Sequence, residues 1–387
     1  MPTQKLSKHI LVTAGEPSSD LLASLVIKDL KKRFPDIRVS ALGGKNLAAI
    51  ADSFIFDLSN MGIMGWTDPL LKAFPLLKAY RAVKRKIAAD PIDLHMPVDY
   101  YGFNVRIASL AKKSGAKVVY YISPQVWATR KNRIHKIRKL TDLVLCLFPF
   151  EEPFYNEHGI KACFVGHPMA QMLRKYVNLK SQISNLKSPL VGILPGSRPR
   201  EIVQNVPILL GAWRKIKNKI PNASAIIFKV NGIPPQLYPE QGELLKMGIS
   251  EAFGSDHEKR ALLDLALTTS GTATLENLIL GVPMLSIYTV KPAWLYHVLK
   301  RALHIRYTSM PNILANRKII DEFVWPHKGP LDNIIDEVSA SALKTLQNKD
   351  SAEAMRKELL KLSNSLIHEN RNPIEYASEQ IEKILKT

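Results

Sequence analysis

The chain has 387 residues, 46% of them hydrophobic and 23% charged, and it carries a formal net charge of +20. This length favours two globular domains, and no apolar run reaches the roughly eighteen residues that cross a bilayer. The polar N-terminus lacks the apolar core of a signal peptide, so we expect a cytoplasmic protein. Cys146 and Cys163 lie in apolar, strand-like runs, which predicts buried thiols rather than a disulfide or a metal site.

The first half of the chain alternates strand-like runs with helical patterns. The run 9–15 ends in glycine, and Asp20 begins a helical pattern of leucines. Further strand-like runs cover 39–44, 118–122, 143–147 and 163–165. This alternation predicts an α/β domain with a parallel sheet covered by helices on both faces.

A basic and apolar segment lies between Asp68 and Asp90, where no acidic residue occurs. Six basic residues alternate there with apolar ones: Lys72, Lys78, Arg81, Lys84, Arg85 and Lys86. Basic residues on an apolar stretch favour a helix at an anionic membrane surface. A helix packed on the core with a solvated basic face explains the spacing of Leu76, Tyr80, Val83 and Ile87 about equally well. The second basic run, 130–139, is open to the same two interpretations.

A polar stretch at 178–188 interrupts the pattern and predicts a linker. A second alternation follows, with strand-like runs at 190–194, 225–230, 266–269 and 284–288, and a helical tail broken at Pro373 closes the chain. We therefore expect three parts: an N-terminal domain over 1–175, a C-terminal domain over 189–347, and a helical tail over 348–387.

Two turns in the second half predict a site for a nucleoside diphosphate. The apolar run from Val191 breaks into Gly196, Ser197 and Arg198, and a second run breaks into residues 270–276. Such turns before helices present backbone N–H groups and a helix dipole to phosphate. Arg198 would supply a planar cation, and Glu276 could accept hydrogen bonds from ribose. The predicted donor site comprises Gly196, Ser197, Arg198, Ser270, Gly271, Thr272, Ala273, Thr274 and Glu276. The alternative is that Gly196 and Gly271 only end strands.

Together with the segments 118–127, 147–151, 164–168 and 311–315, these turns resemble lipid-A-disaccharide synthases. The matches run in the family's order from about Gly15 to about Glu322. The resemblance implies an inverting glycosyltransferase with two Rossmann-like domains facing a cleft, the GT-B type, that needs no metal or other cofactor. It also implies the reaction, which joins UDP-2,3-diacylglucosamine to 2,3-diacylglucosamine 1-phosphate and releases UDP.

The resemblance further implies which residues form the acceptor site. Asp99 would be the catalytic base, because it ends a strand where a carboxylate can take the acceptor hydroxyl's proton; the alternative is that it only caps the next helix. The family's first loop corresponds here to Gly15, Glu16, Ser18 and Asp20 and would bind the acceptor's phosphate, although Ser18 and Asp20 could equally be helix caps. Gln125 and His167 would contact substrate, with a structural role as the alternative for His167. Asn312 matches a donor-site asparagine of the family.

The charge and the amphiphilic substrates predict a peripheral protein on the inner face of the cytoplasmic membrane. One rival is an epimerase or transferase acting on soluble UDP-N-acetylhexosamine, which would have little use for the basic and apolar segment at 70–86. The other rival is a basic nucleic-acid-binding protein. The Lys and Arg runs lack interleaved stacking aromatics, so we expect no nucleic-acid partner.

Overall fold

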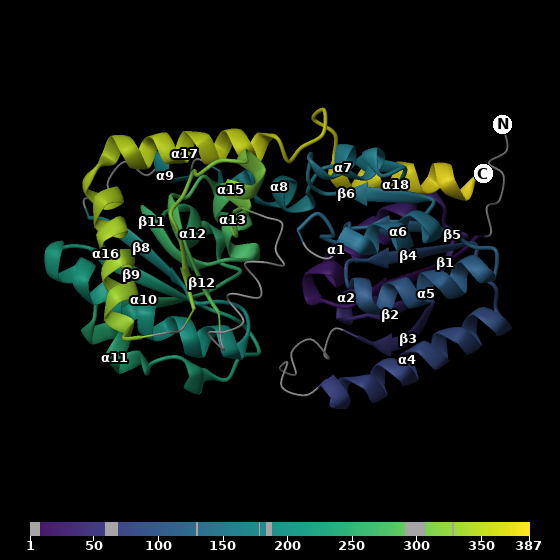
Figure 1. Ribbon diagram of the computed structural model, residues 1–387, viewed down its shortest axis with the longest axis horizontal. Coiled ribbons are helices and arrows are strands. Elements are labelled where there is room, and N and C mark those ends of the chain that lie inside the picture. The colour runs from purple at the N-terminus through teal and green to yellow at the C-terminus, as the bar shows by residue number, and fades with distance from the viewer. Residues whose placement is uncertain are drawn as a thin grey trace. The chain divides into compact units, whose positions relative to one another are not determined.

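The structure is a computed structural model (Figure 1) that describes residues 8–58, 69–128, 131–177, 179–182, 188–290, 306–326 and 329–387. The chain forms two compact units. The first unit comprises Met1–Pro168 and Leu366–Thr387, and the second unit comprises Met169–Ser365. Both are α/β units built on parallel sheets, as predicted.

The division between the units differs from the one expected from composition. It falls at Pro168, before the polar stretch at 178–188, because the segment after Pro168 packs on the second unit. There the Lys180 side chain donates to the Leu262 carbonyl oxygen at 2.9 Å, and the rings of Tyr176 and His257 lie 6.0 Å apart. The expected tail, 348–387, is divided between the two units.

In the described part of the first unit, seven parallel strands form the sheet in the order β3-β2-β1-β4-β5-β6-β7. These are β1 (His9–Ala14), β2 (Arg38–Gly43), β3 (Ser53–Asp57), β4 (Leu94–Val98), β5 (Lys117–Tyr121), β6 (Leu143–Cys146) and β7 (Ala162–Phe164). The helices are α1 (Pro17–Arg33), α2 (Lys45–Ala48), α4 (Pro69–Ala89), α5 (Tyr101–Lys113), α6 (Ile134–Leu140), α7 (Glu151–Glu157) and α18 (Pro373–Leu385). Strands β1 and β4 are buried along their whole length, as expected of central strands covered on both faces.

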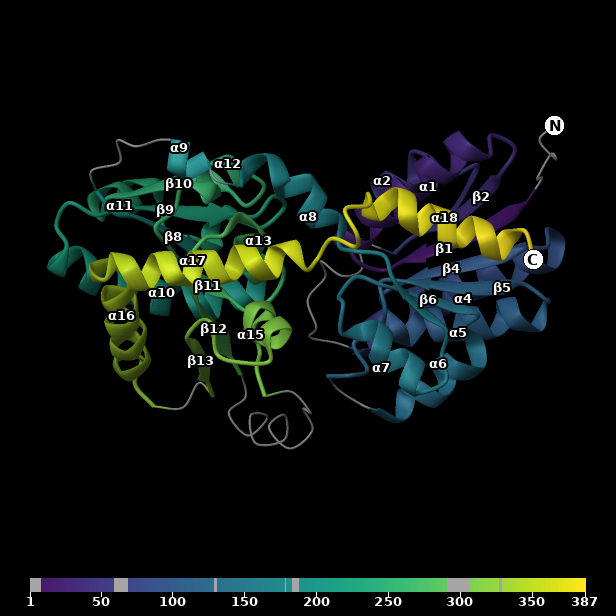
Figure 2. The ribbon, with the colours of Figure 1, turned by 90° about the horizontal axis from the view of Figure 1, so that it is seen from above.

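The last helix belongs to the first unit. Helix α18 packs along α1, as Figure 2 shows, and the Ser378 hydroxyl donates to the Val26 carbonyl oxygen at 3.3 Å. Ala377 and Ile381 of α18 are fully buried. Both cysteines are free, but only Cys146 is buried; Cys163 is partly exposed beside Tyr376, so the prediction of a buried thiol is wrong for Cys163.

Helix α4 packs on the core through one face and exposes apolar and basic side chains on the other. Its inner face is buried in the core of the first unit through Ala79, Val83 and Ile87. Its outer face carries exposed Phe74 (82%) and Leu77 (43%). Exposed basic residues continue that face at Lys78, Arg81, Lys84 and Arg85. The side chains of residues 69–73, which include Lys72, lie outside the described residues. Among the described helices, none is long and apolar enough to cross a bilayer.

In the described part of the second unit, six parallel strands follow the order β10-β9-β8-β11-β12-β13. These are β8 (Leu190–Leu194), β9 (Ser224–Lys229), β10 (Ile249–Phe253), β11 (Leu265–Thr269), β12 (Met284–Thr289) and β13 (Glu322–Trp325). The helices are α8 (Pro168–Leu173), which starts at the boundary, α9 (Leu179–Gln182), α10 (Pro199–Lys219), α11 (Gln241–Lys246), α12 (His257–Ala261), α13 (Thr272–Leu280), α15 (Met310–Ala315), α16 (Leu331–Gln347) and α17 (Lys349–Asn364). Fully buried Trp213 lies in its core.

Each sheet has one point at which the direction of strand succession reverses. It lies between β1 and β4 in the first unit and between β8 and β11 in the second. In open parallel sheets, loops leave such neighbouring strands in opposite directions, and ligands bind in the crevice outside the carboxyl ends. Gly15 follows β1 and Asp99 follows β4, while Gly196 and Ser270 follow closely on β8 and β11. Gly15, Asp99, Gly196 and Ser270 therefore lie at the two switch points.

Candidate functional site

Asp99 lies at the switch point of the first unit in a strained turn. Its φ is +47° and that of Tyr100 is +41°, a region that residues other than glycine rarely adopt and that often marks a functional site. The Asp99 carbonyl oxygen accepts hydrogen bonds from Asn104 Nδ2 at 2.8 Å and from Tyr120 Oη at 2.7 Å, which fix the turn. The N-cap of α5 is Tyr100, so Asp99 does not hold the capping position that was its alternative role.

A buried polar network supports this turn from below. The Thr13 hydroxyl donates its proton to Asn104 Oδ1 at 2.7 Å. The same hydroxyl lies 2.8 Å from His95 Nε2, and because its only proton is already used, the imidazole must be the donor of this second hydrogen bond. Burial lowers the pKa of His95 to about 3, which keeps the ring neutral. The network therefore holds the Asp99 turn without placing a second charge beneath it.

The surroundings of the Asp99 carboxylate favour a proton acceptor. Burial and the like charge of Glu16 raise the pKa of Asp99 above its ordinary value. A hydrogen bond from the Tyr100 amide acts in the opposite direction but does not cancel this rise. A general base works best when its pKa approaches the working pH. Gly15 is needed beside it, because a Cβ there would lie 2.4 Å from Cγ of Tyr100.

A pocket of about 260 Å3 opens at Asp99. It is lined by Asp99, Tyr101, Pro124, Gln125, Val126 and Arg133. The structure thus brings together Asp99 and Gln125, two of the residues expected to meet the acceptor. Sequence reasoning missed Tyr101 and Arg133, whose guanidinium lies 4.3 Å from the Tyr101 ring centroid. Arg133 could have been found from its place in the basic run 130–139, which follows soon after the segment 118–127 that contains Gln125. Arg130 of the same run lies outside the described residues.

The side chains of the loop after β1 differ in what they contact. The Asp20 carboxylate is buried and accepts hydrogen bonds from the amides of Gly44 (2.7 Å), Asn46 (3.0 Å) and Leu47 (3.2 Å). Asp20 therefore caps a helix, as its alternative role proposed, but the helix is α2 rather than α1. Ser18 is exposed, and Glu16 stands at the N-cap of α1 without a capping hydrogen bond from its side chain.

His167 has the surroundings of a structural residue. Its ring is buried 5.5 Å from the Phe148 ring, and its backbone amide donates to the Leu366 carbonyl oxygen at 2.8 Å. Burial lowers the pKa of His167 to about 4, so the ring is neutral near pH 7. These contacts fit the alternative role, in which His167 secures the point where the chain returns to the first unit.

In the second unit, the turn after β8 is closed by a residue that sequence reasoning missed. Glu201 Oε2 accepts hydrogen bonds from the amides of Ser197 (3.0 Å) and Arg198 (3.3 Å), and Oε1 accepts from Arg198 Nη1 at 3.2 Å. A Cβ at Gly196, whose φ is +124°, would lie 2.7 Å from Cβ of Glu201. Glu201 therefore occupies amides that were expected to face a phosphate. The Arg198 side chain is 56% exposed. The signal was a glutamate three residues after the N-cap, the spacing of a capping box.

The turn after β11 is more open. Gly271, with φ +143°, is the N-cap of α13, and a Cβ there would meet nothing within 4 Å. The amides of Thr272 and Ala273 stand in the first turn of the helix, where no intrahelical acceptor exists. The Thr274 hydroxyl donates to the Gly271 carbonyl oxygen at 2.8 Å, and the Ser270 hydroxyl donates to that of Thr308 at 2.6 Å. Hydrogen bonds from Ser270 and Thr274 thus hold this turn, which presents backbone donors.

Glu276 lies one turn inside α13 and is ionised. Its carboxylate pairs with the guanidinium of Arg260, which is 3% exposed, and lies 3.6 Å from His257 Nε2. Burial by itself would raise the pKa of Glu276, but the neighbouring imidazole of His257 and the charge of Arg260 hold it below its ordinary value. A fixed, charged acceptor near the open turn can receive hydrogen bonds from hydroxyl groups.

The side chain of Asn312 makes its hydrogen bonds within the protein. Its Nδ2 donates to the Ile320 carbonyl oxygen at 3.0 Å and to Glu322 Oε1 at 2.9 Å, and its Oδ1 accepts from the amide of Ile319 at 2.6 Å. The side chain is buried and braces the segment between α15 and β13. The structure does not place its amide for a ligand of the α13 turn.

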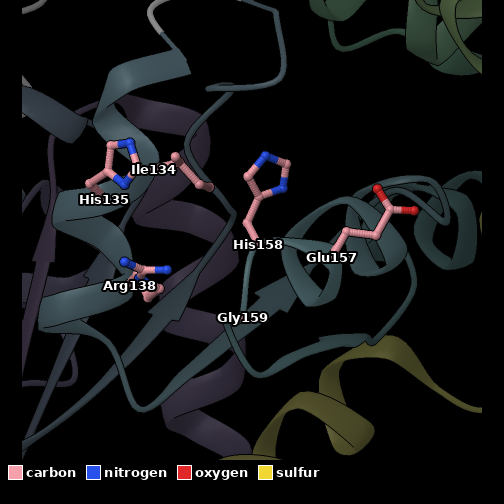
Figure 3. Close-up of a pocket in the computed structure, with 6 residues that line it drawn as sticks. All are labelled: Ile134, His135, Arg138, Glu157, His158 and Gly159. Carbon is pink, nitrogen blue, oxygen red and sulfur yellow. The ribbon is translucent and has the colours of Figure 1, made fainter.

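A second pocket, of about 320 Å3, lies between α6 and α7 (Figure 3). It is lined by Ile134, His135, Arg138, Glu157, His158 and Gly159. In Figure 3 the Glu157 carboxylate points away from His135 and Arg138. Its lining residues come from α6 and from the end of α7, and none of them belongs to the turns that follow the switch-point strands. We assign it no part in the site.

Two Rossmann-like units define the class: the protein has the GT-B fold, shared by glycosyltransferases and epimerases. CalG4, the calicheamicin glycosyltransferase, is similar with a TM-score of 0.62 and 14% identity, covering 98% of both chains. UDP-GlcNAc 2-epimerase from Neisseria meningitidis is similar with a TM-score of 0.57 and 13% identity, covering 98% of this chain and 99% of its own. At such identities the likeness shows the fold alone.

Sequence comparison settles the family. The sequence model of lipid-A-disaccharide synthetase matches residues 10–381. Lipid-A-disaccharide synthase 2 of Legionella pneumophila subsp. pneumophila is 34% identical over 370 residues, which cover 92% of each chain. The chain belongs to the lipid-A-disaccharide synthase family, which confirms the resemblance seen in its motifs.

Proposed function

We propose that this protein transfers a diacylglucosaminyl group from UDP-2,3-diacylglucosamine to the 6-hydroxyl of 2,3-diacylglucosamine 1-phosphate. The products are the tetraacyl disaccharide 1-phosphate and UDP, a step of lipid A biosynthesis. The match to the family over residues 10–381 carries the proposal, because the fold alone is equally that of an epimerase of soluble UDP-sugars. The pocket at Asp99 and the open turn at α13 are the features that support it.

In the first unit, Asp99 takes the proton of the acceptor hydroxyl as its oxygen attacks the anomeric carbon of the donor. The new bond forms as the bond to UDP breaks, so a single displacement inverts the configuration at that carbon. Gln125 contacts the acceptor in the same pocket, and Arg133 gives the pocket a positive charge that suits the acceptor's phosphate. Gly15, Glu16 and Ser18 border the switch point as the remaining acceptor contacts.

In the second unit, the charge that develops on departing UDP is stabilised by Arg198 and by the amides at the start of α13. We assign the backbone contacts to Gly271, Thr272, Ala273 and Thr274, because Glu201 already holds the amides of the first turn. Gly196 and Ser197 then shape that turn. Glu276 accepts hydrogen bonds from ribose. A planar cation and a helix N-terminus supply the electrostatic stabilisation that a divalent metal gives in other transferases, so we propose a metal-independent reaction.

The raised pKa of Asp99 predicts the pH dependence of the reaction. Asp99 accepts a proton only when ionised, so kcat/KM should fall as the pH drops through the pKa of this carboxyl, which lies above the ordinary value of about 3.9. The charge of Glu16 contributes to the shift, so Glu16→Gln should move the acidic limb to lower pH. The midpoint of the limb is the quantity to measure, since it is independent of any loss of acceptor affinity. A limb that stays in place, or moves to higher pH, would contradict the assignment.

We also propose that α4 attaches the protein reversibly to the inner face of the cytoplasmic membrane. The helix is anchored to the first unit by Ala79, Val83 and Ile87, while exposed Phe74 and Leu77 continue into a row of exposed basic residues. Apolar side chains can enter the interface while cations meet anionic headgroups. Because the proposed substrates carry acyl chains that lie in the membrane, attachment would bring the protein to them.

Changing Lys78, Arg81, Lys84 and Arg85 together to glutamine should release the protein from anionic vesicles. Each basic residue near an anionic surface contributes about 1 kcal/mol, which salt weakens. The melting temperature should stay close to that of the wild type, because the buried face of α4 is unchanged. Co-sedimentation with vesicles across a salt series, with thermal unfolding in parallel, measures both.

A matched control changes the exposed residues Lys344, Lys349, Lys357 and Lys361 of α16 and α17 to glutamine, which removes the same charge elsewhere. Only the α4 variant should lose vesicle binding. Equal losses in both variants would mean that net charge alone governs binding. Unchanged pelleting of the α4 variant would place the membrane contact on another surface.

A further inference from the structure

One wall of the Asp99 pocket is a short segment without regular structure. Pro124, Gln125 and Val126 line the pocket between β5 and α6, and Ser123 and Trp127 flank them. A segment of this kind holds a shape complementary to a ligand only when side chains from elsewhere fix it. Contacts to Ser123 and Trp127 therefore decide how well this wall is defined.

Both flanking residues bind the same carboxylate, that of Glu151 at the start of α7. Glu151 Oε1 accepts hydrogen bonds from Ser123 Oγ at 2.6 Å and from Trp127 Nε1 at 3.1 Å. Its Oε2 accepts from the amides of Leu147 at 3.2 Å and Phe148 at 3.1 Å. The two carboxylate oxygens thus accept from four donors, and Glu151 is only 2% exposed.

Further contacts tie the wall to the same helix. Tyr155 Oη of α7 donates to the Pro124 carbonyl oxygen at 2.7 Å, and the Trp127 ring meets the Phe150 ring edge-on with centroids 4.9 Å apart. The wall residues are thus held at both ends by Glu151 and in the middle by Tyr155. Helix α7 acts as the support of this side of the pocket.

Burying the carboxylate of Glu151 is costly. Burial raises the pKa of Glu151 to about 7, against the opposing effect of its hydrogen-bond donors. The amides of Leu147 and Phe148 precede α7, whose N-cap is Phe150, so Glu151 does not cap this helix. What the buried carboxylate provides is a link between this stretch of backbone and the side chains of Ser123 and Trp127.

We infer that Glu151 is a positioning residue of the acceptor pocket. Its carboxylate holds Pro124, Gln125 and Val126 in the shape that receives the acceptor sugar beside Asp99. This inference rests on the proposed function, in which this pocket binds 2,3-diacylglucosamine 1-phosphate. Glu151 itself does not line the pocket, so it acts through the segment it holds.

The test is a split between the kinetic constants of the two substrates. Glu151→Gln replaces an acceptor oxygen with an amide that cannot accept from all four donors, and a Ser123→Ala/Trp127→Phe variant removes two donors while leaving Glu151 in place. Each should raise KM for 2,3-diacylglucosamine 1-phosphate at least about tenfold, the scale of one hydrogen bond to a charged group. KM for UDP-2,3-diacylglucosamine should stay within about twofold.

Glu152→Gln is the matched control, because Glu152 is the next residue of α7 and accepts from the Phe164 amide rather than from residues 123–127. It should leave both KM values unchanged. If Glu151→Gln and the Ser123/Trp127 variant only lower the yield of active enzyme, with both KM values unchanged, Glu151 is structural and the inference is wrong. If Glu151→Gln does not fold, the Ser123/Trp127 variant decides alone. Wild-type protein that releases no UDP in the presence of the acceptor would contradict the proposed function, and this inference with it.

Discussion

Replacing Asp99 with asparagine is expected to lower kcat by about 10²–10⁴, the usual contribution of a general base. The amide has the shape of the carboxylate but cannot take the acceptor's proton. The turn should survive the change, because Asn104 and Tyr120 hold it through the Asp99 carbonyl oxygen. Steady-state kinetics at saturating concentrations of both substrates measure the effect.

Two controls accompany this variant. UDP affinity, measured by calorimetry, should equal that of the wild type, because the donor residues belong to the second unit. Asp36→Asn, which changes an exposed carboxylate of the first unit, should leave kcat unchanged. Near-normal turnover in folded Asp99→Asn protein would show that another group is the base.

Replacing Arg198 with alanine is expected to weaken UDP binding by about 10–150-fold, since a hydrogen bond between charged groups contributes about 1.5–3 kcal/mol. Turnover should fall as well, because charge on the diphosphate grows as UDP leaves. Arg198→Lys keeps the charge but loses the planar fork, so its affinity should lie between those of the wild type and Arg198→Ala. Calorimetric titration with UDP separates the three proteins.

Glu276 tests the nucleoside end of the same site. Removing the Glu276 carboxylate also leaves the buried guanidinium of Arg260 without this partner. Glu276→Gln is a milder change than Glu276→Ala, and the melting temperature of the variant must be measured alongside its UDP affinity. Wild-type protein should prefer UDP over the 2′-deoxy or 3′-deoxy analogue, and the variant should lose that preference. Unchanged UDP affinity in both the Arg198 and Glu276 variants would mean that the two turns do not bind a nucleotide.

The framework of the molecule could be predicted from the sequence because its signals are local. Apolar runs that break into small residues mark strand ends, and Gly15, Asp99, Gly196 and Gly271 all lie where such runs end. The order of strands is a long-range property that the pattern does not contain. Only the structure shows that these residues fall at the two switch points.

The task of each side chain was harder to predict, because its partners come from distant elements. The sequence predicts that Asp20 belongs to a phosphate-binding loop, yet its carboxylate accepts hydrogen bonds from the amides at the start of α2. Asn312 reads as a ligand contact, yet it braces its own segment through Glu322. Arg260 gave no signal as a site residue, because its ion pair with Glu276 depends on geometry rather than on composition. Glu201 gave only the spacing of a capping box. The division between the units also differs from the expected one, since the polar residues at 178–188 do not mark where packing changes.

The central claim is that the protein joins two acylated glucosamine derivatives. Its most direct test is to measure UDP release and product mass with UDP-2,3-diacylglucosamine, with and without 2,3-diacylglucosamine 1-phosphate, beside UDP-N-acetylglucosamine as a soluble alternative. The account predicts UDP release that depends on the acylated acceptor, together with a disaccharide 1-phosphate that carries four acyl chains. Equal turnover or epimerisation of UDP-N-acetylglucosamine, or UDP release that ignores the acceptor, would contradict it.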